Sequence, residues 1–389
     1  MQTTTTTPAE RVFEPARDDD GLEDLRREID AIDHAVLELL NHRASASLAV
    51  GSVKRGQGSP VYRPEREGLL VETLLNKNPG PLPNAHLRAI YREILSSSRV
   101  LQAPLNVAFL GPEGTFSHMA AMESLGKNAS FRAMSRFDDI FEAVETRDCE
   151  LGVVPLENSL HGTVVQSIDL FASHTVYIHS EWFSRISHCL MSREDNLSVI
   201  QTVYSHPQAL GQCAGWLRDN LPHAELLSVD STASAAHKVL AERNAAAVGH
   251  GALAPRIGLS VLARNIEDTC DNWTRFVCIG PEPVPLQTSR NKGENTDVKT
   301  SVLFTLADKP GALAAVLQSF AKAGVNMNKL ESRPMRMERW KYIFFCDVSC
   351  DLADAKHSPL LERLQELCHS FRILGAYPSG EYIQKGIDA

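Results

Sequence analysis

The sequence predicts three domains of different class: an all-α segment, an α/β segment and an α+β segment. Three observations predict this division. Apolar residues repeat every three or four positions up to residue 103, short apolar runs alternate with helical stretches over residues 104–282, and strand and helix periods follow one another from residue 300. A chain of 389 residues is also too long for one ordinary core.

Composition limits the partners that the chain can have. Its formal net charge is -9 and it has no basic tail, which argues against nucleic acid as the main partner. No run of eighteen apolar residues occurs, so we expect no membrane span. The eight cysteines form no Cys-x-x-Cys pair, which predicts reduced thiols in a cytoplasmic protein. The first twenty residues lack the apolar core of a signal peptide and are expected to form a disordered tail.

Residues 21–103 are predicted to form three helices. The first begins near Leu22 and ends at the Gly56–Pro60 stretch, Pro64 lies in the first turn of the second, and the third covers about residues 85–102. The apolar positions of the first helix are Leu25, Ile29, Ile32, Val36 and Leu39. Because three helices make a thin bundle, we expect a homodimer or higher homo-oligomer.

Residues 104–282 are predicted to have an α/β fold, because short apolar runs alternate with helical stretches. These runs are 107–110, 151–154, 202–204, 245–248 and 276–279. No three-glycine dinucleotide fingerprint, P-loop lysine or His-Glu-x-x-His motif occurs, so no organic cofactor and no metal is expected.

A proline-rich stretch, residues 283–299, is predicted to be a linker to the last domain, residues 300–389. The order of elements there is strand, helix, strand, strand, helix, strand, which is the ferredoxin-like unit. The linker predicts a self-contained domain whose removal, after about Gln287, would leave measurable catalysis.

Cations are concentrated between Lys54 and Arg66, which raises the question of an anion site. Arg43 and Lys54 are eleven residues apart, so both project from one helix face roughly 16 Å apart along the axis. Arg26 lies about a quarter-turn away and suits a pocket on a partner helix. The spacing alone favours a solvated charged stripe over an anion site, and both interpretations stay open at this point.

The helical segment resembles the all-helical chorismate mutase family over residues 21–103. The matching positions are Leu25-Arg26-Arg27-Glu28-Ile29-Asp30, Arg43, Lys54, Arg66-Glu67, Ser98 and Gln102. The resemblance implies that Arg43, Lys54 and Arg66 clamp the carboxylates of chorismate, while Arg26 enters from the other subunit.

The same resemblance assigns the remaining groups of the first site. Glu67 would hold the substrate hydroxyl, and Ser98 would add a neutral donor. Lys54 and Gln102 would donate to the ether oxygen, where negative charge develops in a reaction that needs no nucleophile. Arg63 stands where one well-known family member has an acid, and it is left out of the site.

Polar motifs follow the strands of the α/β segment, at positions where such folds gather ligands. They are Gly111–Ser117, Pro155–Ser159, Ser205–Gln208 with Gln212, and Asn272–Phe276. Each motif alone is also compatible with an ordinary turn or helix cap.

Together, these motifs resemble the prephenate dehydratase family over residues 104–282, with Thr-Arg-Phe at 274–276 as the most specific signature. The resemblance implies two lobes like those of a periplasmic binding protein, with prephenate between them. Thr274 would bind the departing ring hydroxyl. The orienting groups would be Thr115, Asn158, Ser159, Ser205 and Gln212.

Two roles in this second site stay open. Arg275 would either pair with a substrate carboxylate or brace the cleft. The proton donor is not identified: His206 is a candidate because histidine is a common general acid, but a histidine beside proline in a turn is more often structural.

The C-terminal segment resembles the ACT regulatory domain of the same enzymes. Gly311-Ala312-Leu313 and Glu331-Ser332-Arg333 match its phenylalanine-binding motifs. The sequence as a whole resembles the bifunctional chorismate mutase/prephenate dehydratases, which turn chorismate into phenylpyruvate and are inhibited by phenylalanine. One rival is a non-catalytic metabolite sensor. The other, a mutase fused to prephenate dehydrogenase, needs a nicotinamide site that the sequence lacks.

Overall fold

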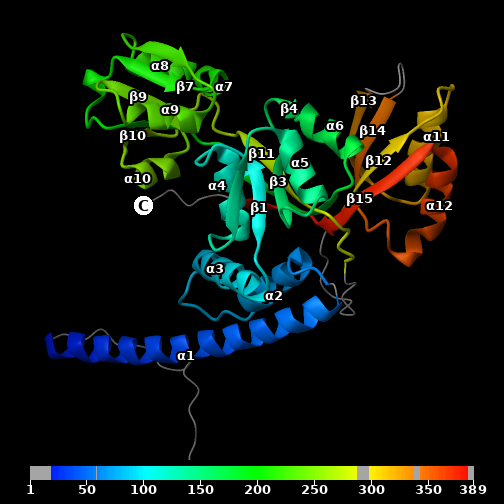
Figure 1. Cartoon of the computed structure of the whole chain (residues 1–389), viewed down its shortest axis with the longest axis horizontal. Helices are drawn as coiled ribbons and strands as arrows, with labels where there is room; N and C mark the ends of the chain where they lie inside the picture. The colour runs from blue at the N-terminus through cyan, green and yellow to red at the C-terminus, as the bar shows by residue number, and fades with distance from the viewer. Residues whose placement is uncertain (1–18, 58, 287–297, 336–341, 384–389) are drawn as a thin grey trace, which may run out of the picture. The chain divides into compact units, whose positions relative to one another are not determined.

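The computed structural model describes residues 19–57, 59–286, 298–335 and 342–383 (Figure 1). Residues 1–18, most of the predicted tail, and residues 287–297, most of the predicted linker, lie outside this description. The chain divides into two compact units, one ending at Ser59 and the other beginning at Pro60.

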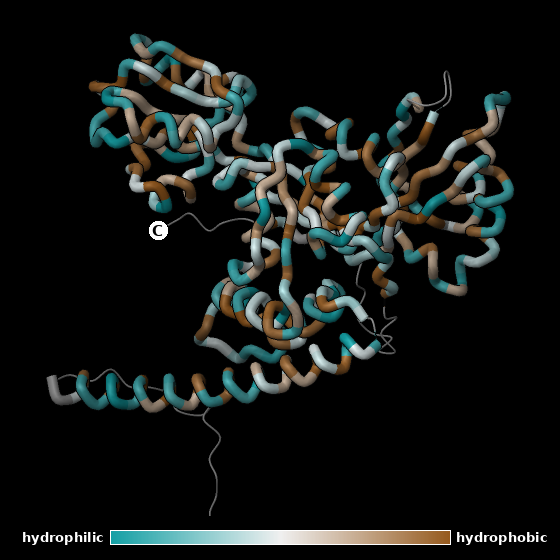
Figure 2. Tube along the Cα trace, in the orientation of Figure 1, coloured by the Kyte–Doolittle hydropathy of each residue, from teal (hydrophilic) through white to brown (hydrophobic). Residues whose placement is uncertain are grey.

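The first unit contains a single long helix, α1 (Asp19–Gln57). Its apolar row is exposed in the isolated chain: Ile29 is 56% and Leu39 is 67% accessible. Figure 2 shows hydrophobic and hydrophilic residues interspersed along this helix. No helix in the described part of the chain is both long enough and apolar enough to span a bilayer.

Helices α2 (Pro64–Asn76) and α3 (Asn84–Gln102) belong to the second unit and confirm the predicted helical segments. Pro64 occupies the first helical position, where its missing N–H costs nothing. The buried Tyr62 hydroxyl is 3.0 Å from the Ser180 hydroxyl, and Asn128 N–H donates to Ser96 Oγ at 3.1 Å. Both helices are therefore fixed against the α/β part of the chain.

The α/β segment forms two lobes. The sheet of the first lobe has the order β16-β5-β11-β3-β1-β2, with β4 paired to β3. Its strands are β1 (Asn106–Leu110), β2 (Ser130–Met134), β3 (Leu151–Asn158), β4 (Gly162–Thr163), β5 (Tyr177–Arg185), β11 (Trp273–Gly280) and β16 (Glu381–Ile383). Its helices are α4 (Phe116–Leu125), α5 (Phe137–Glu145) and α6 (Val165–Ser173).

The second lobe is a five-stranded sheet with the order β10-β6-β9-β7-β8. Its strands are β6 (Cys189–Ser192), β7 (Thr202–Ser205), β8 (Glu225–Ser228), β9 (Ala245–Gly249) and β10 (Ser260–Arg264). Its helices are α7 (Pro207–Gln212), α8 (Ala214–Asn220), α9 (Thr232–Val239) and α10 (Ala254–Ile257). The five apolar runs predicted as strands all lie in strands, namely β1, β3, β7, β9 and β11.

Two crossing segments join the lobes, one between β5 and β6 and one between β10 and β11. They run side by side, because Ile186 N–H donates to Asn272 O at 2.8 Å and Ile266 N–H donates to His188 O at 3.0 Å. This two-strap connection is the architecture of a periplasmic binding protein, as the resemblance implied.

The C-terminal domain has the predicted ferredoxin-like order. It consists of β12 (Val298–Thr305), α11 (Ala312–Lys322), β13 (Met327–Pro334), β14 (Tyr342–Val348), α12 (Ser358–Leu367) and β15 (Ser370–Pro378). One face of its sheet, with Val302 and Phe304, packs on the helices α11 and α12. The other face, with Leu303 and Phe345, packs on the first lobe (Figure 1).

The expectation of a self-contained C-terminal domain is wrong, because its sheet shares one hydrophobic core with the first lobe. Leu374 and Tyr377 are buried together with Ile178 and Val277. The backbones also approach closely: a Cβ at Gly375 would lie 2.0 Å from Ile178 O. After the domain, β16 returns to pair with β5 in the first lobe.

Ending the chain at Leu286 is therefore expected to destabilise the first lobe rather than merely remove a regulatory part. Burial of each large apolar side chain contributes about 1.5–3 kcal/mol, and several would be exposed at once. We expect the melting temperature to fall by roughly 10 °C or more, measured by circular dichroism. An unchanged melting temperature would show that the shared core contributes nothing to stability.

Candidate functional site

The residues of the dehydratase-like motifs meet where β3 and β11 pair. These strands are antiparallel, and their register places Thr274 directly opposite Asn158. Asn158 Nδ2 donates to Thr274 Oγ1 at 3.0 Å, and it also lies 2.7 Å from Asn272 Oδ1. Thr274 is buried, with 8% of its surface accessible.

The orientation of the Asn158 amide is determined by its surroundings. Its Oδ1 accepts from the backbone N–H groups of Leu160 at 3.1 Å and His161 at 3.0 Å. Since only a carbonyl oxygen can accept both, Nδ2 must face Thr274. The threonine oxygen is thus an acceptor from Asn158, and its own hydrogen remains for another acceptor.

Gln212 of the second lobe reaches the loop that follows Asn158. Its Nε2 is 2.9 Å from His161 Nε2, and its Oε1 is 2.8 Å from His188 Nε2. His188 lies on the crossing segment before β6, and burial lowers its pKa, so it is neutral at neutral pH. A polar chain therefore connects the two lobes across the site.

Phe116, at the start of α4, contacts two histidines from other parts of the chain. Its ring is 5.2 Å from those of His188 and His250, edge-on in both cases. Thr115 caps the same helix: its Oγ1 accepts from His118 N–H at 3.4 Å and donates to Leu110 O at 3.0 Å. The beginning of α4 therefore lies beside the crossing segment that carries His188 and beside His250, which follows β9.

Ser159 and Ser205 are placed differently from each other. Ser159 Oγ accepts from Trp273 N–H at 2.9 Å, beside the Asn158–Thr274 pair. Ser205 is fully buried and its hydroxyl donates to Val248 O at 2.6 Å. His206 accepts from Gln208 N–H at 3.2 Å and caps α7, which favours the structural interpretation of that histidine.

Arg275 points into the protein, on the opposite side of β11 from Thr274. Its guanidinium contacts Glu181 Oε2 at 2.6 Å and Asp347 Oδ2 at 2.5 Å, and its side chain is 4% exposed. Of the two roles left open for Arg275, this placement supports bracing.

The mutase-like positions fall on both compact units. Arg26, Arg43 and Lys54 lie on α1, and Lys54 is in its last turn. Arg66 and Glu67 lie at the start of α2. Ser98 and Gln102 lie one turn apart at the end of α3, where Gln102 Nε2 donates to Ser98 O at 3.2 Å.

Glu67 has a partner that the sequence did not indicate. The buried guanidinium of Arg99 donates to Glu67 Oε2 and to Leu125 O. The same guanidinium lies over the Tyr62 ring, 5.4 Å from its centre. Arg99 thereby fixes the carboxylate of Glu67 and joins α3 to the α/β part.

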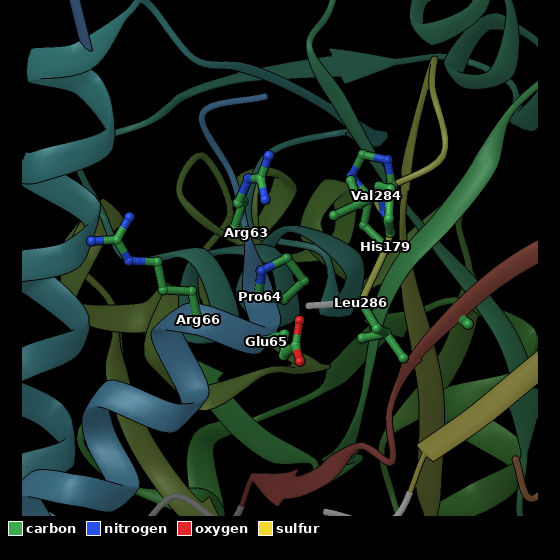
Figure 3. A pocket seen from close by; sticks show the side chains of 9 residues that line it. Arg63, Pro64, Glu65, Arg66, His179, Val284 and Leu286 are labelled. Atoms are coloured by element: carbon green, nitrogen blue, oxygen red, sulfur yellow. The ribbon is translucent and has the colours of Figure 1, made fainter. Parts of the chain in front are cut away.

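An open pocket lies beside the N-terminal end of α2 (Figure 3). Arg63, Glu65 and Arg66 line one side, and His179 of β5 lines another. Figure 3 shows the guanidinium groups of Arg63 and Arg66 extending in different directions, so they do not form a clamp. His179 Nε2 donates to Glu282 O at 2.8 Å, and burial lowers the pKa of this histidine.

The two ACT-like motifs lie on the C-terminal domain as predicted. Gly311 precedes α11 with φ +83°, a conformation that favours glycine, and a Cβ there would meet open space. Glu331 and Arg333 are on the sheet face toward the first lobe. Thr163 Oγ1 donates to Glu331 Oε2 at 3.1 Å, and Arg333 Nε lies 3.4 Å from Asp169 Oδ1.

Sequence reasoning missed several residues around the candidate site: His161, His188, His250, Asn272 and Phe116. Asn272 and Phe116 lie inside quoted motifs, so adjacency was a signal for them. The histidines had no such signal, because they stand singly in the sequence. Among the described residues, no group of three or more His, Cys, Asp or Glu side chains is arranged to hold a metal ion.

The fold and the placed motifs define an enzyme with a helical mutase segment, a two-lobed dehydratase and an ACT domain. Family models agree in this order: chorismate mutase type II matches residues 25–103, prephenate dehydratase residues 107–284 and the ACT domain residues 300–367.

Relatives match along most of the chain. The bifunctional chorismate mutase/prephenate dehydratase of Aquifex aeolicus is 39% identical over 92% of this chain and 98% of its own length. That of Stutzerimonas stutzeri is 37% identical over the same shares. A solved prephenate dehydratase of Arthrobacter aurescens in complex with L-Phe is 31% identical, with a TM-score of 0.64, and covers 70% of this chain and 90% of that one. The chain belongs to the bifunctional chorismate mutase/prephenate dehydratase family and carries both enzymatic domains.

Proposed function

We propose that this chain converts chorismate to prephenate, converts prephenate to phenylpyruvate between the two lobes, and is inhibited by phenylalanine. The observation that carries the dehydratase assignment is the Asn158–Thr274 pair at the cleft. The deciding assay follows phenylpyruvate formation from chorismate, with and without phenylalanine. A metabolite sensor without catalysis would bind prephenate and release no phenylpyruvate.

Dehydration breaks two bonds of prephenate. The bond to the ring carboxylate breaks, carbon dioxide leaves, and its electron pair enters the ring as the bond to the 4-hydroxyl breaks. The hydroxyl leaves as water once it accepts a proton. Because Asn158 donates to Thr274 Oγ1, the threonine hydrogen is left for another acceptor, and Thr274 acts as donor or relay to that leaving oxygen.

The other polar groups of the cleft orient prephenate. Ser159 and Gln212 flank the Asn158–Thr274 pair from different lobes. Thr115 lies at the N-terminal end of α4, where the helix dipole favours a carboxylate. Ser205 acts through the strand it braces, since its hydroxyl is bonded to Val248 O.

In the mutase site, Arg43, Lys54 and Arg66 bind the carboxylates of chorismate, and Lys54 and Gln102 donate to the ether oxygen. Glu67, held by Arg99, accepts the substrate hydroxyl. Ser98 adds a neutral donor. Arg26 serves the site of the partner subunit. The catalytic requirement is a folded substrate conformer and donors aimed at the developing charge.

The domain limits that fit these roles are 21–103 for the mutase, 104–282 for the dehydratase, 283–299 for the linker and 300–389 for the ACT domain. The exposed apolar row of α1 suits a second copy of the chain, which supports a homodimer or higher homo-oligomer. All eight cysteines are free thiols, which suits the reducing cytoplasm.

Phenylalanine binds the ACT domain, with Gly311, Ala312 and Leu313 against the ligand and Glu331, Ser332 and Arg333 alongside. The solved prephenate dehydratase of Arthrobacter aurescens is in complex with L-Phe, and the motifs that resemble phenylalanine-binding motifs of ACT domains are present here. Inhibition then follows from preferential binding of phenylalanine to a less active arrangement, typically a coupling of about 1–3 kcal/mol.

Replacing Gly311 by valine is expected to abolish phenylalanine inhibition and to leave measurable dehydratase activity, because the side chain fills the ligand space. Valine is also strained at φ +83°, so Gly324→Val, at φ +68° after the same helix and also facing open space, is the matched control. Ala312→Leu fills the site without a positive φ. Undiminished phenylalanine binding by Gly311→Val in calorimetry would place the effector site elsewhere.

A further inference from the structure

A buried cluster of charged groups lies between the ACT sheet and the strand that carries Thr274. Arg275 of β11 is bonded to Glu181 of β5 at 2.6 Å, to Asp347 of β14 at 2.5 Å and to the Tyr377 hydroxyl of β15 at 3.2 Å. The Ser301 hydroxyl lies 2.5 Å from both Asp347 Oδ1 and the Tyr377 hydroxyl.

The cluster is balanced in charge, and its central carboxylates are closed to solvent. Lys299 Nζ lies 2.6 Å from Glu181 Oε1. Arg275 also lies 3.8 Å from Glu157 Oε2, and Glu157 pairs with Lys329, so three cations meet three carboxylates. The side chains of Glu181 and Asp347 are 0% and 1% exposed. Burial alone would lower the pKa of Arg275, but Tyr377, Asp347 and Glu181 together raise it, so the guanidinium is charged throughout the physiological range. Losing one carboxylate would leave the buried guanidinium of Arg275 with one partner fewer for its charge.

Arg275 is adjacent to Thr274, and its anchors come from a different domain. Thr274 and Arg275 project from opposite sides of β11, so a shift of the guanidinium moves the backbone that carries the threonine. Glu157, which is next to Asn158, also forms an ion pair with the ACT sheet: Lys329 Nζ of β13 lies 2.8 Å from Glu157 Oε1. Both members of the Asn158–Thr274 pair therefore have a neighbour held by the ACT domain.

We propose that Asp347 and Tyr377 of the ACT sheet are positioning residues for prephenate dehydration, which hold Arg275 and thereby fix Thr274 against Asn158. The proposal rests on the proposed role of Thr274. It assigns the ACT domain a part in catalysis itself, besides effector binding.

The test uses the full chain with Tyr377→Phe, Asp347→Asn and Ser301→Ala. Each keeps side-chain volume nearly constant. We expect the kcat for prephenate to fall about tenfold while KM changes less than twofold, because a small displacement of a catalytic group lowers turnover without removing binding contacts. Chorismate mutase activity on the same samples reports the integrity of the fold.

The matched control is Thr305→Val. It removes a part-buried hydrogen bond of the same sheet, Thr305 to Ser370 at 2.6 Å, at the end of β12 and four residues beyond Ser301. Its dehydratase kcat should equal that of the wild type. The double variant of Asp347→Asn with Arg275→Lys should be no slower than the slower single variant, because both changes act through one contact.

Wild-type kcat in folded Tyr377→Phe and Ser301→Ala proteins would overturn the proposal, even if Asp347→Asn failed to fold. An equal loss in the Thr305→Val control would also overturn it, since any weakening of the sheet would then suffice. If Thr274→Val keeps wild-type dehydratase activity, the proposed role of Thr274 is wrong. If Thr274→Val loses this activity while Tyr377→Phe and Ser301→Ala keep it, only the positioning role of the ACT residues is wrong.

Discussion

Thr274→Val is expected to reduce prephenate dehydration by on the order of a hundredfold or more, since it removes a preorganised donor from the leaving hydroxyl. Valine has the same shape, so the packing of this buried position is retained. Asn158 keeps its other contacts, to Asn272 Oδ1 and Trp273 O, and stays in place. The measurement is phenylpyruvate absorbance with supplied prephenate.

The mutase provides the internal control for this variant. Chorismate turnover should continue at the wild-type rate, and prephenate should accumulate. Thr274→Ser, which restores the hydroxyl, should recover most of the dehydratase activity. Normal phenylpyruvate production by Thr274→Val would remove the threonine from the mechanism.

The elements of the fold were largely predictable because periodicity is a local property. Apolar spacing located α1, α2 and α3 to within a few residues, and apolar runs located the strands. The site was predictable as a set of motifs at strand ends. The contact between Asn158 and Thr274, 116 residues apart, depends on the register of β3 and β11, which no local pattern specifies.

Contacts between domains were the part that sequence could not supply. Arg275 is bonded to residues 94, 72 and 102 positions away, on three different strands. A buried ionic cluster has no composition signal, since each of its members is an ordinary surface residue elsewhere. The proline-rich linker suggested independence, whereas β12 is buried on both faces, with Val302 and Phe304 in the core of the C-terminal domain and Leu303 in the core shared with the first lobe.

The contact between Glu67 and Arg99 was likewise not predictable from the sequence. Its position was identified from the resemblance, but Arg99 lies beside Ser98 in the sequence and reads as one more surface cation. The structure buries Arg99 to 3% exposure between Glu67, Leu125 O and the Tyr62 ring. A charged side chain is rarely so buried without a function in holding other groups.

Lys54→Ala is expected to lower chorismate mutase activity by on the order of a hundredfold or more. The rearrangement is unimolecular, so the enzyme contributes a compact substrate conformer and donors toward the ether oxygen, where charge develops as the carbon–oxygen bond breaks. Deleting the ammonium removes one such donor and one clamp on a carboxylate. Both losses act on kcat/KM for chorismate, measured by its disappearance.

Arg55→Ala is the matched control for this prediction. It removes a cation from the next position of α1, where Arg55 is exposed and donates to Ser52 Oγ at 3.2 Å. A nonspecific effect of charge on substrate attraction would reduce both variants alike and would be screened by salt. A specific role leaves Arg55→Ala near wild type, keeps dehydration of supplied prephenate intact in both proteins, and persists at high ionic strength. If Lys54→Ala turned over chorismate near the wild-type rate, the cations of α1 would be solvated surface charges and not part of a chorismate site.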